Sequence, residues 1–207
     1  MALIAVLDYG IGNLHSAQKA LQHVGADARL TADPALIRDA AGVVLPGVGN
    51  FGRCMQALED SGLDELAIEC AGSGRPFLGV CVGMQMLYEG SEESPDIPGL
   101  GVLAGIVRRL PDGVKRPQMQ WNLLVRTRPS GLLDGLPDPV WAYFVHSFAA
   151  ENDDDAVAVC DYGGPVVAAV ERDALWATQF HPEKSSRTGL AILRNFVGRA
   201  SSAAEAA

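Results

Sequence analysis

One cysteine stands between two glycines near the middle of the chain, in the run Gly79-Val80-Cys81-Val82-Gly83. An apolar segment, 76–80, leads into it and a helix-forming sequence follows. This is the layout of a nucleophile elbow, a sharp turn from strand to helix that presents a nucleophile above a sheet. At a helix N-terminus the unpaired N–H groups and the helix dipole favour the thiolate, which is the reactive form of cysteine. The pattern therefore predicts that Cys81 is a nucleophile.

Two neighbours of Cys81 would share in this chemistry. The backbone amide of Val82 would face an oxyanion formed at the sulfur. Gln85 follows four residues after Cys81, so on a helix the two side chains share a face and Gln85 can reach a bound ligand. The alternative is a buried core cysteine, but a strand that needs only a core thiol has no use for a glycine on each side.

A cysteine nucleophile needs a base, and the base needs a group that orients it. His181 is the best candidate of the four histidines, because it follows an apolar run and precedes Pro182-Glu183. Proline makes the residue before it extended, and in an extended chain His181 and Glu183 project to the same side. We therefore expect Glu183 to orient the imidazole while its other nitrogen faces Cys81, although the same residues also suit a plain turn into the last helix. The other histidines fall in a predicted helix or strand, where packing or surface roles are usual: His15, His23 and His146.

A second glycine-containing turn, Pro46-Gly47-Val48-Gly49, follows the apolar run 42–45. Glycines at this point let backbone N–H groups approach an anion without a Cβ in the way. We interpret the turn as the second half of an oxyanion hole that Val82 begins. An ordinary tight turn is an equally good interpretation of these residues alone.

Composition narrows the range of functions. The 207 residues carry a net charge of −9 with a pI near 4.8 and no dense Lys/Arg cluster, which argues against nucleic acid and anionic membranes as partners. No segment approaches a bilayer span and the N-terminus lacks the basic region of a signal peptide, so we expect a cytoplasmic protein. The cysteines show neither disulfide nor metal-site spacing, and the turn Gly10-Ile11-Gly12 lacks the third glycine of a dinucleotide fingerprint. We therefore expect no metal and no cofactor.

The order of predicted elements indicates an α/β protein. In the first half, apolar strand-like runs alternate with helical spacing, which predicts a parallel sheet with right-handed crossovers. The expected strands are 3–7, 28–31, 42–45 and 76–80. The expected helices run from a cap at Asn13 to Gly25, from 34 to 39, and from 51 to 71 with a break at 61–62.

The second half of the chain has a different pattern. After a polar, proline-rich loop at 91–99, strand-like runs follow one another without helices, which predicts antiparallel additions to the parallel core. These runs are 102–110, 119–127, 140–149, 157–162, 166–171 and 175–180. Helical spacing returns at 188–197. We expect a single domain over residues 1–200, followed by a frayed tail at 201–207.

Several of these segments together resemble a known family. The elbow around Cys81 and the sequence His181-Pro182-Glu183 resemble the catalytic triad of the class I glutamine amidotransferases. The flanking segments narrow the resemblance to the glutaminase subunits of imidazole glycerol phosphate synthase, in histidine biosynthesis. These segments are Asp8-Tyr9-Gly10-Ile11-Gly12-Asn13, Pro46-Gly47-Val48-Gly49, Gly83-Met84-Gln85, Tyr143-Phe144-Val145-His146-Ser147 and His181-Pro182-Glu183-Lys184-Ser185.

The resemblance implies the three-layer, flavodoxin-like fold of that family and a glutaminase activity. Cys81 would attack the side-chain amide of L-glutamine and form a thioester, His181 would protonate the departing ammonia, and Glu183 would orient His181. The resemblance also implies that Gln85 and Glu93 hold the glutamine. The oxyanion amides that it implies are those of Val48, Gly49 and Val82.

The product ammonia implies a partner. Ammonia protonated by water is a poor nucleophile, so it must reach its acceptor through a closed path. The glutaminase layout accounts for the chain, and we therefore expect the acceptor site on another chain. By resemblance this partner is the barrel-shaped cyclase subunit of a heterodimer, which makes imidazole glycerol phosphate and an aminoimidazole carboxamide ribotide. The residues expected at the contact are Asn13, Trp121 and Lys184.

One segment departs from the family pattern. Where Pro-His-Met-Gly-Trp-Asn is usual, this chain has Pro117-Gln118-Met119-Gln120-Trp121-Asn122, a change that leaves the triad residues untouched. Two other functions stay open. One is the glutaminase subunit of another class I amidotransferase such as anthranilate synthase, in which histidine is common in place of Met84. The other is a cysteine hydrolase or thiol protein that shares only the elbow.

Overall fold

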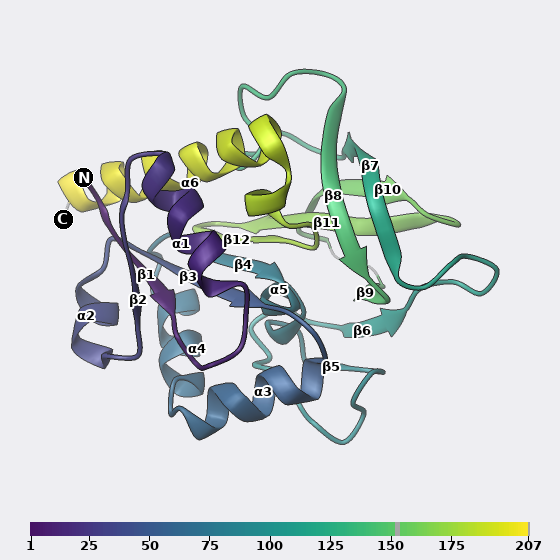
Figure 1. The fold of residues 1–207 in the computed structure, drawn as a ribbon, viewed down its shortest axis with the longest axis horizontal. Coiled ribbons are helices and arrows are strands. Elements are labelled where there is room, and N and C mark those ends of the chain that lie inside the picture. Colours follow the sequence, from purple (N-terminus) through teal and green to yellow (C-terminus); the bar gives the residue numbers. More distant parts are fainter. Residues whose placement is uncertain (152–153, 207) are drawn as a thin grey trace.

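The computed structural model describes residues 1–151 and 154–206. Over these residues the chain forms a large mixed sheet with helices on both faces and a small second sheet beside it (Figure 1). The large sheet has the order β2-β1-β3-β4-β12-β11-β10-β7-β8, and the small one β5-β6-β9. The strands are β1 Leu3–Leu7, β2 Asp27–Thr31, β3 Gly42–Gly47, β4 Phe77–Cys81, β5 Gly90–Ser91, β6 Ile106–Arg109, β7 Gln118–Arg126, β8 Val140–His146, β9 Phe148–Ala150, β10 Ala156–Asp161, β11 Pro165–Arg172 and β12 Leu175–Thr178.

The helices cover the parallel half of the large sheet. In Figure 1, α1 and α6 lie on one face of this half and α3 and α4 on the other. The predicted break after residue 60 separates α3 from α4 as expected. No helix in the described part of the chain is both long and apolar enough to span a bilayer. The helices are α1 Leu14–His23, α2 Pro34–Asp39, α3 Phe51–Asp60, α4 Asp64–Gly72, α5 Val82–Met86, the short 3-10 helix Pro182–Lys184 and α6 Ser186–Ala206.

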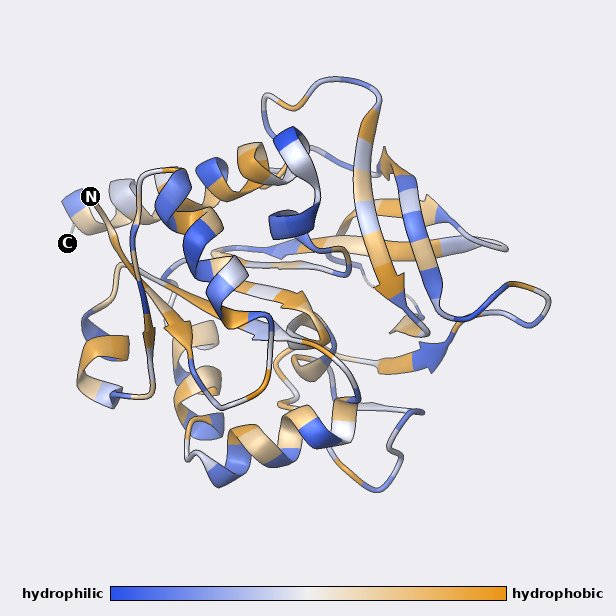
Figure 2. Ribbon diagram, in the orientation of Figure 1, coloured by the Kyte–Doolittle hydropathy of each residue, from blue (hydrophilic) through white to orange (hydrophobic). Residues whose placement is uncertain are grey.

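The half of the large sheet formed by β2, β1, β3, β4 and β12 is parallel. Strands β3 and β4 are buried along their whole length, as expected for parallel strands that are covered on both faces. Figure 2 shows the apolar colour concentrated in the central strands. The prediction of an α/β fold with a mostly parallel core is therefore confirmed.

Strand β12 joins the parallel half although it comes from the end of the chain. It pairs with β4 in the register Thr178↔Val80, so the segments that follow these two strands leave the sheet at the same edge. The predicted nucleophile, Cys81, is the last residue of β4, and the predicted base, His181, lies in the segment that follows β12. The strand order of the sheet therefore brings them together.

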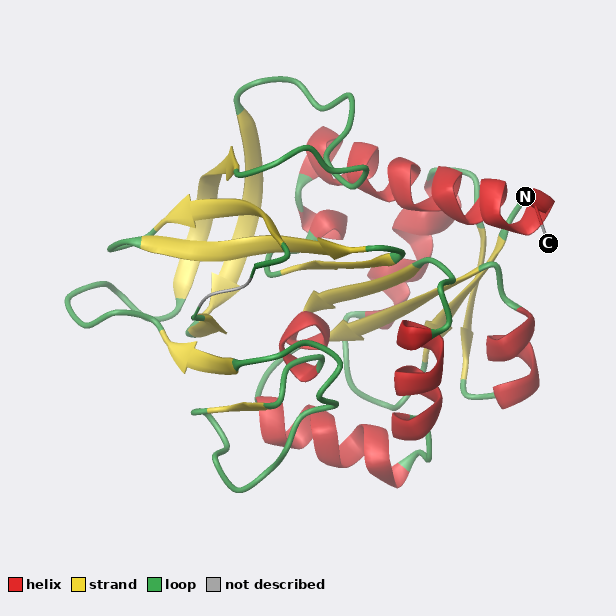
Figure 3. Cartoon of the chain, turned by 180° about the vertical axis from the view of Figure 1, so that it is seen from behind, coloured by secondary structure: helices red, strands yellow, loops and turns green. Residues whose placement is uncertain are grey.

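The other half of the sheet confirms the predicted antiparallel additions. Strands β11, β10, β7 and β8 continue from β12 in antiparallel pairs. Seen from behind in Figure 3, these outer strands project beyond the helices. One face of β7 and β8 is left exposed to solvent, with Met119, Trp121, Val125 and Trp141 on its surface.

Two predicted strands differ from the structure. The run 140–149 is broken at Ser147, because its second part, β9, leaves the large sheet and pairs with β6. The run 102–110 is a strand only from Ile106 onward. Gly105, directly before that strand, has a positive φ of 104°, which a regular strand does not accommodate.

The expectation of a frayed tail at 201–207 is wrong for residues 201–206. Helix α6 continues to Ala206, and Ala200 near its end is fully buried. Alanine has the highest helix propensity of all residues, which explains why this alanine-rich end prolongs the helix. Ala207 lies outside the described residues.

Candidate active site

Cys81 lies at the turn between strand β4 and helix α5. Its backbone has φ +55° and ψ −112°, a conformation that residues with a side chain rarely adopt and that marks stored strain. Gly83 makes the turn possible, because a Cβ at this position would lie 1.9 Å from the Leu45 carbonyl oxygen. The sharp strand-to-helix turn that the sequence predicts is therefore present in the structure.

His181 and Glu183 lie beside Cys81, beyond the end of the neighbouring strand β12. The Nδ1 atom of His181 is 2.8 Å from Oε1 of Glu183, and the ring is also hydrogen-bonded to Cys81. Since Nδ1 faces the carboxylate, Nε2 is the atom left for the sulfur. The two side chains are almost completely buried, with 2% and 4% of their surface exposed. The structure thus brings together the thiol, imidazole and carboxylate that the sequence singled out.

The backbone around His181 is tied to strand β8. The His181 N–H donates to the Tyr143 carbonyl (3.1 Å). The Ser185 hydroxyl donates to the His181 carbonyl (2.7 Å) and accepts from the Tyr143 N–H (2.9 Å). Pro182 occupies the first turn of the short helix that follows, where its missing N–H is not needed. These contacts fix the direction in which the imidazole leaves the backbone.

The hydrogen bonds also set the charge of the imidazole and the carboxylate. Burial lowers the pKa of His181, but the hydrogen bonds and charges of Cys81 and Glu183 outweigh it and raise the pKa from 6.5 to about 9. Burial raises the pKa of Glu183, but the hydrogen bond and charge of His181 outweigh it and the pKa is lowered overall. At neutral pH a proton is therefore held on the imidazole, between the carboxylate and the sulfur.

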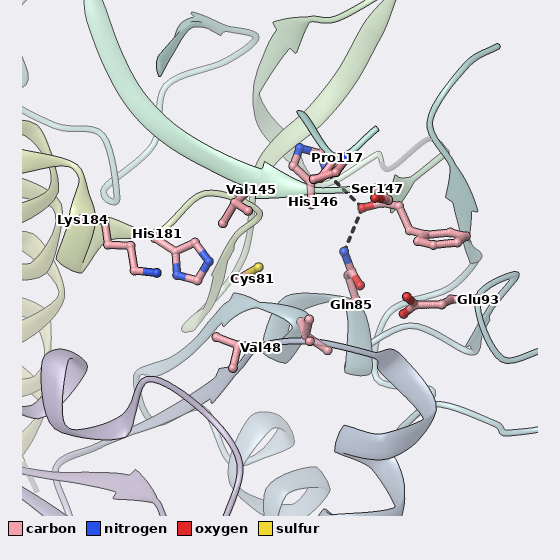
Figure 4. Close-up of a pocket in the computed structure, with 13 residues that line it drawn as sticks. Val48, Cys81, Gln85, Glu93, Pro117, Val145, His146, Ser147, His181 and Lys184 are labelled. Atoms are coloured by element: carbon pink, nitrogen blue, oxygen red, sulfur yellow. Dashed lines mark hydrogen bonds between the residues drawn. The ribbon is translucent and has the colours of Figure 1, made fainter. Parts of the chain in front are cut away.

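A cavity of about 300 Å³ opens over Cys81 (Figure 4). Residues from both halves of the chain meet at its wall, and most of them are residues that the sequence analysis singled out. Glu183 is not part of the wall, since it stands behind the His181 ring. The lining residues are Val48, Gly49, Cys81, Val82, Gln85, Glu93, Pro117, Val145, His146, Ser147, Phe148, His181 and Lys184.

The turn after β3 approaches Cys81 from the other side of the cavity. The thiol of Cys54, in α3, donates to the Val48 carbonyl (3.2 Å), and burial raises the pKa of this thiol, which keeps its proton in place. In a trans peptide the carbonyl and the following N–H point in opposite directions. The amide of Gly49 is therefore turned away from Cys54, as an oxyanion donor would have to be.

Gln85 and Glu93 lie at the far end of the cavity from His181 (Figure 4). The Gln85 side-chain nitrogen donates to the Phe148 carbonyl (2.8 Å), which leaves the side-chain oxygen for a ligand. The Glu93 carboxylate accepts from the Phe51 N–H (2.7 Å) at the start of α3. Together they place an amide oxygen and a carboxylate at the end of the cavity opposite the imidazole.

Two of the three expected interface residues lie outside the cavity. Asn13 does not cap α1 with its side chain; its amide nitrogen donates to Glu183 Oε1 (3.3 Å). Trp121 lies on the exposed face of β7, in edge-to-face contact with Tyr143. Lys184, the third, is exposed at the cavity wall.

Sequence reasoning missed one buried residue next to the sulfur and undervalued another. Gln179 stands two residues before His181, and its side-chain nitrogen is 3.9 Å from Cys81 Sγ; a polar residue that ends an apolar strand was the available signal. His146 lines the cavity, although its ring bonds inward to the Phe148 carbonyl (2.9 Å). Burial lowers the pKa of His146 to about 4, so its ring is uncharged at neutral pH.

The departure from the family pattern falls on two very different positions. Gln118 is fully buried, and its side-chain amide lies 2.9 Å from Nε2 of His146. Gln120 is exposed on β7, although it shares its face of the strand with Gln118 and lies opposite Met119 and Trp121. The first replacement is therefore accommodated by a hydrogen bond behind the cavity, while the second falls at a position exposed to solvent.

The fold and this site together define a class of protein. A cysteine on a strand-to-helix turn, a histidine–glutamate pair just beyond the end of the adjacent parallel strand and a cavity beside them are the features of a glutamine amidotransferase. The chain belongs to the class-I glutamine amidotransferase family, because the family model "Glutamine amidotransferase class-I" matches residues 5–200. It is a glutamine amidotransferase enzyme.

Within this family the chain is similar to subunits of imidazole glycerol phosphate synthase. It is 49% identical over 198 residues to the imidazole glycerol phosphate synthase subunit HisH of Symbiobacterium thermophilum, covering 95% of this chain and 93% of that protein. It is also 49% identical to HisH of Methanothermobacter thermautotrophicus, covering 94% and 98%. HisH of Desulfitobacterium hafniense is 47% identical, covering 94% and 93%.

Solved structures show the same fold at low sequence identity. A putative GMP synthase protein from Thermoplasma acidophilum has a TM-score of 0.73 at 23% identity, covering 100% of this chain and 97% of that one. PurLQS from Thermotoga maritima has a TM-score of 0.76 at 17% identity, covering 96% and 99%.

Proposed function

We propose that this chain is the glutaminase subunit of an imidazole glycerol phosphate synthase. It hydrolyses L-glutamine to glutamate and ammonia and passes the ammonia to a cyclase subunit. The observation that carries the proposal is the Cys81–His181–Glu183 set over a cavity of about 300 Å³, in a chain about half identical to HisH proteins.

The first half of the reaction forms a thioester. The Cys81 thiolate attacks the carboxamide carbon of glutamine, and the carbonyl oxygen becomes an oxyanion. The amides of Val48, Gly49 and Val82 face this oxygen and stabilise the charge. The imidazolium of His181 then gives its proton to the amide nitrogen, the C–N bond breaks, and ammonia leaves.

The second half releases glutamate. His181, now neutral, takes a proton from a water molecule that attacks the thioester carbon. The C–S bond breaks and the electron pair returns to the sulfur, which restores the thiolate beside the imidazolium. Glu183 keeps its charge throughout and holds the Nδ1 proton of the ring, so that Nε2 always faces the reacting atoms.

The far end of the cavity binds the amino-acid end of glutamine. The free side-chain oxygen of Gln85 and the carboxylate of Glu93 are both acceptors, and an α-ammonium group is the part of glutamine that donates. Binding there directs the carboxamide of the substrate toward Cys81.

The exposed face of β7 and β8 is the docking surface for the cyclase. Met119, Trp121 and Val125 alternate along β7, and the pairing Leu123↔Trp141 places Trp141 on the same face. These four side chains are 62%, 45%, 51% and 46% exposed. Aromatic and Met side chains gathered on one exposed face are typical of protein interfaces. The face adjoins the cavity wall at Val145, so a partner that covers it also covers the route by which ammonia leaves.

Replacement of the nucleophile tests this proposal. In C81A the complex with the cyclase should lose glutamine-dependent synthesis by a factor on the order of 10³ or more, and it should keep synthesis from added ammonium salt. C70A, which removes a buried thiol of α4 outside the site, should retain both activities. Glutamine hydrolysis by C81A would show that the nucleophile is another residue. Failure of any cyclase subunit to co-purify and to accept the ammonia would instead contradict the assignment to this synthase.

A further inference from the structure

Gln179 is a buried polar residue at the centre of the site for which the mechanism above has no role. It follows β12 directly, its backbone N–H donates to the Ala168 carbonyl (2.9 Å), and none of its surface is exposed. A buried side-chain amide is stable only when its polar atoms find partners. The partners of this amide lie on the reacting side of the sheet, at Gln85 and Cys81.

The direction of the Gln179 amide follows from its neighbours. The Phe148 carbonyl can only accept a hydrogen bond, so Gln85 must turn its nitrogen toward it (2.8 Å, drawn in Figure 4). The same nitrogen is 3.0 Å from the side chain of Gln179, which must therefore present its oxygen there. The amide nitrogen of Gln179 is then left on the opposite side, 3.9 Å from Cys81 Sγ.

We propose that Gln179 is a catalytic residue that donates an N–H hydrogen bond to the sulfur of Cys81. This inference rests on the proposed role of Cys81 as the nucleophile. Cys81 is 3% exposed, so a thiolate there has little water around it and depends on donors from the protein. A hydrogen bond to an ionised sulfur is stronger than one to a neutral sulfur. Gln179 therefore favours the thiolate before attack, and again when the C–S bond of the thioester breaks and the electron pair returns to sulfur.

The second contact of Gln179 links this role to substrate binding. Its oxygen accepts from Gln85 and so keeps the Gln85 oxygen directed to the cavity, where the substrate's ammonium group binds. The side-chain amide of Gln179 thus contacts both Gln85 and Cys81, the two residues between which the substrate L-glutamine would lie. Replacing Gln179 should affect both kcat and KM, whereas a residue needed only for packing would change the stability of the protein.

Alkylation of Cys81 tests the inference without using glutamine. Q179M removes the donor with little change in volume. The pH midpoint of the reaction of Cys81 with iodoacetamide, followed on the Cys81 peptide by mass spectrometry, should rise by about one unit, which is about a tenfold loss of thiolate at a given pH. Q179E keeps an acceptor for Gln85 but sets a carboxylate against the sulfur, and it should raise the midpoint further.

The matched control is Q118M. Gln118 is also a fully buried glutamine, and its amide nitrogen is 3.9 Å from the sulfur of Cys160. Its replacement removes the same kind of contact from an unrelated thiol, together with the hydrogen bond of its oxygen to His146, which makes no hydrogen bond to Cys81. The midpoint of Cys81 alkylation should stay unchanged in this variant. A folded Q179M, checked by circular dichroism, with the alkylation profile of the wild-type protein overturns the inference.

A measurement on the wild-type protein covers the case in which the variants do not fold. The side-chain amide signals of Gln179, assigned by ¹⁵N NMR, should shift when Cys81 is alkylated, and those of Gln118 should not. An unchanged Gln179 signal overturns the inference. A shifted alkylation profile in an enzyme that fails to hydrolyse glutamine would instead contradict the proposed function alone.

Discussion

Asn13 donates a hydrogen bond to the carboxylate of Glu183 across 170 positions of sequence. The donor comes from the turn after the first strand, and the acceptor comes from the segment that follows the last one. The bond is made to Oε1, the same oxygen that holds the His181 ring. The first turn of the chain therefore helps to set the direction and the charge of the triad carboxylate.

N13A should lower the rate of glutamine hydrolysis without unfolding the protein. It removes one donor from a buried carboxylate, and hydrogen bonds to charged groups contribute about 1.5–3 kcal/mol, so kcat should fall by roughly ten- to a hundredfold. N13D, which sets a second negative charge against Glu183, should lower kcat further. The control is N195A, because Asn195 donates only to carbonyls of a distant loop. It should change the melting temperature and leave kcat as it is. Equal kcat in N13A and the wild-type complex would contradict the role of Asn13.

The two glycines Gly83 and Gly198 should respond in opposite ways to replacement by alanine. A Cβ at Gly83 would lie 1.9 Å from the Leu45 carbonyl oxygen, whereas at Gly198, in α6, nothing lies within 4 Å. G83A should therefore destabilise the protein by several kcal/mol or prevent folding, since backbone must move. G198A should stabilise it by about 0.5–1 kcal/mol through helix propensity. Urea denaturation of both variants measures the difference. A G83A protein as stable as the wild type would show that the elbow can relax.

The protein should lose stability as pH falls from about 6.5 to about 4, in part through His146. Burial lowers the pKa of this ring from 6.5 to about 4. Between these two pH values the His146 ring is protonated in the unfolded chain but neutral in the folded one. The neutral ring's contribution to the free energy of unfolding is complete above pH 6.5 and is lost as the pH falls toward 4. A pKa shift of this size corresponds to roughly 3 kcal/mol of stability. Comparing urea denaturation of H146Q with that of the wild type isolates the effect. The free energy of unfolding of H146Q should fall less steeply between pH 6.5 and pH 4 than that of the wild type. Equal pH dependence in the two proteins would contradict the prediction.

His181 should act on stability with the opposite sign. Its pKa is raised from 6.5 to about 9, so the folded chain holds a proton there that the unfolded chain releases. The stabilisation that the protonated ring gains from Cys81 and Glu183 is complete below pH 6.5 and is lost as the pH rises through about 9. H181N should therefore have a flatter stability curve than the wild type between pH 6.5 and 9.5, measured by urea denaturation. A curve parallel to that of the wild type would show that the ring is not protonated in the folded protein.

W121A should weaken the complex with the cyclase. Buried tryptophans at the centre of interfaces commonly contribute about 2 kcal/mol or more, so Kd, measured by isothermal titration calorimetry, should rise by roughly thirtyfold. I68A is the control, since Ile68 is also an exposed apolar residue (43%) but lies on α4, away from β7 and β8. Its Kd should match that of the wild type. An unchanged Kd in W121A would place the docking surface elsewhere.

Much of the site could be predicted because its parts are local. The glycines around Cys81 specify the turn, because the chain at Gly83 passes so close to the Leu45 carbonyl that no side chain fits there. The need for glycine can be recognised from a few adjacent residues of the sequence. His181 is extended as predicted, but Glu183 lies in the 3-10 helix Pro182–Lys184 and not in an extended chain, so the ring and the carboxylate meet across a turn two positions long. Gln179, by contrast, could not be assigned from its neighbours, because its partners Gln85 and Cys81 are more than ninety positions away.

The fold shows the same division. The alternation of strands and helices in the first half, and its absence in the second, followed from hydrophobic spacing. The separation of β8 from β9 could not be predicted in this way, because an apolar run has the same pattern whether its residues pair within one sheet or within two. The helical end of the chain at 201–206 was missed because a short alanine-rich segment has no apolar period to mark it, although its intrinsic propensity is high.

The sequence by itself determined which groups can react, because the turn around Cys81 and the pairing of His181 with Glu183 depend on backbone preferences within a few residues. Only the tertiary structure decided that these groups meet. The insertion of β12 beside β4, the contact of Asn13 with Glu183 and the direction of the Gln179 amide all result from hydrogen bonds between distant segments, whose partners are chosen by the packing of the whole sheet.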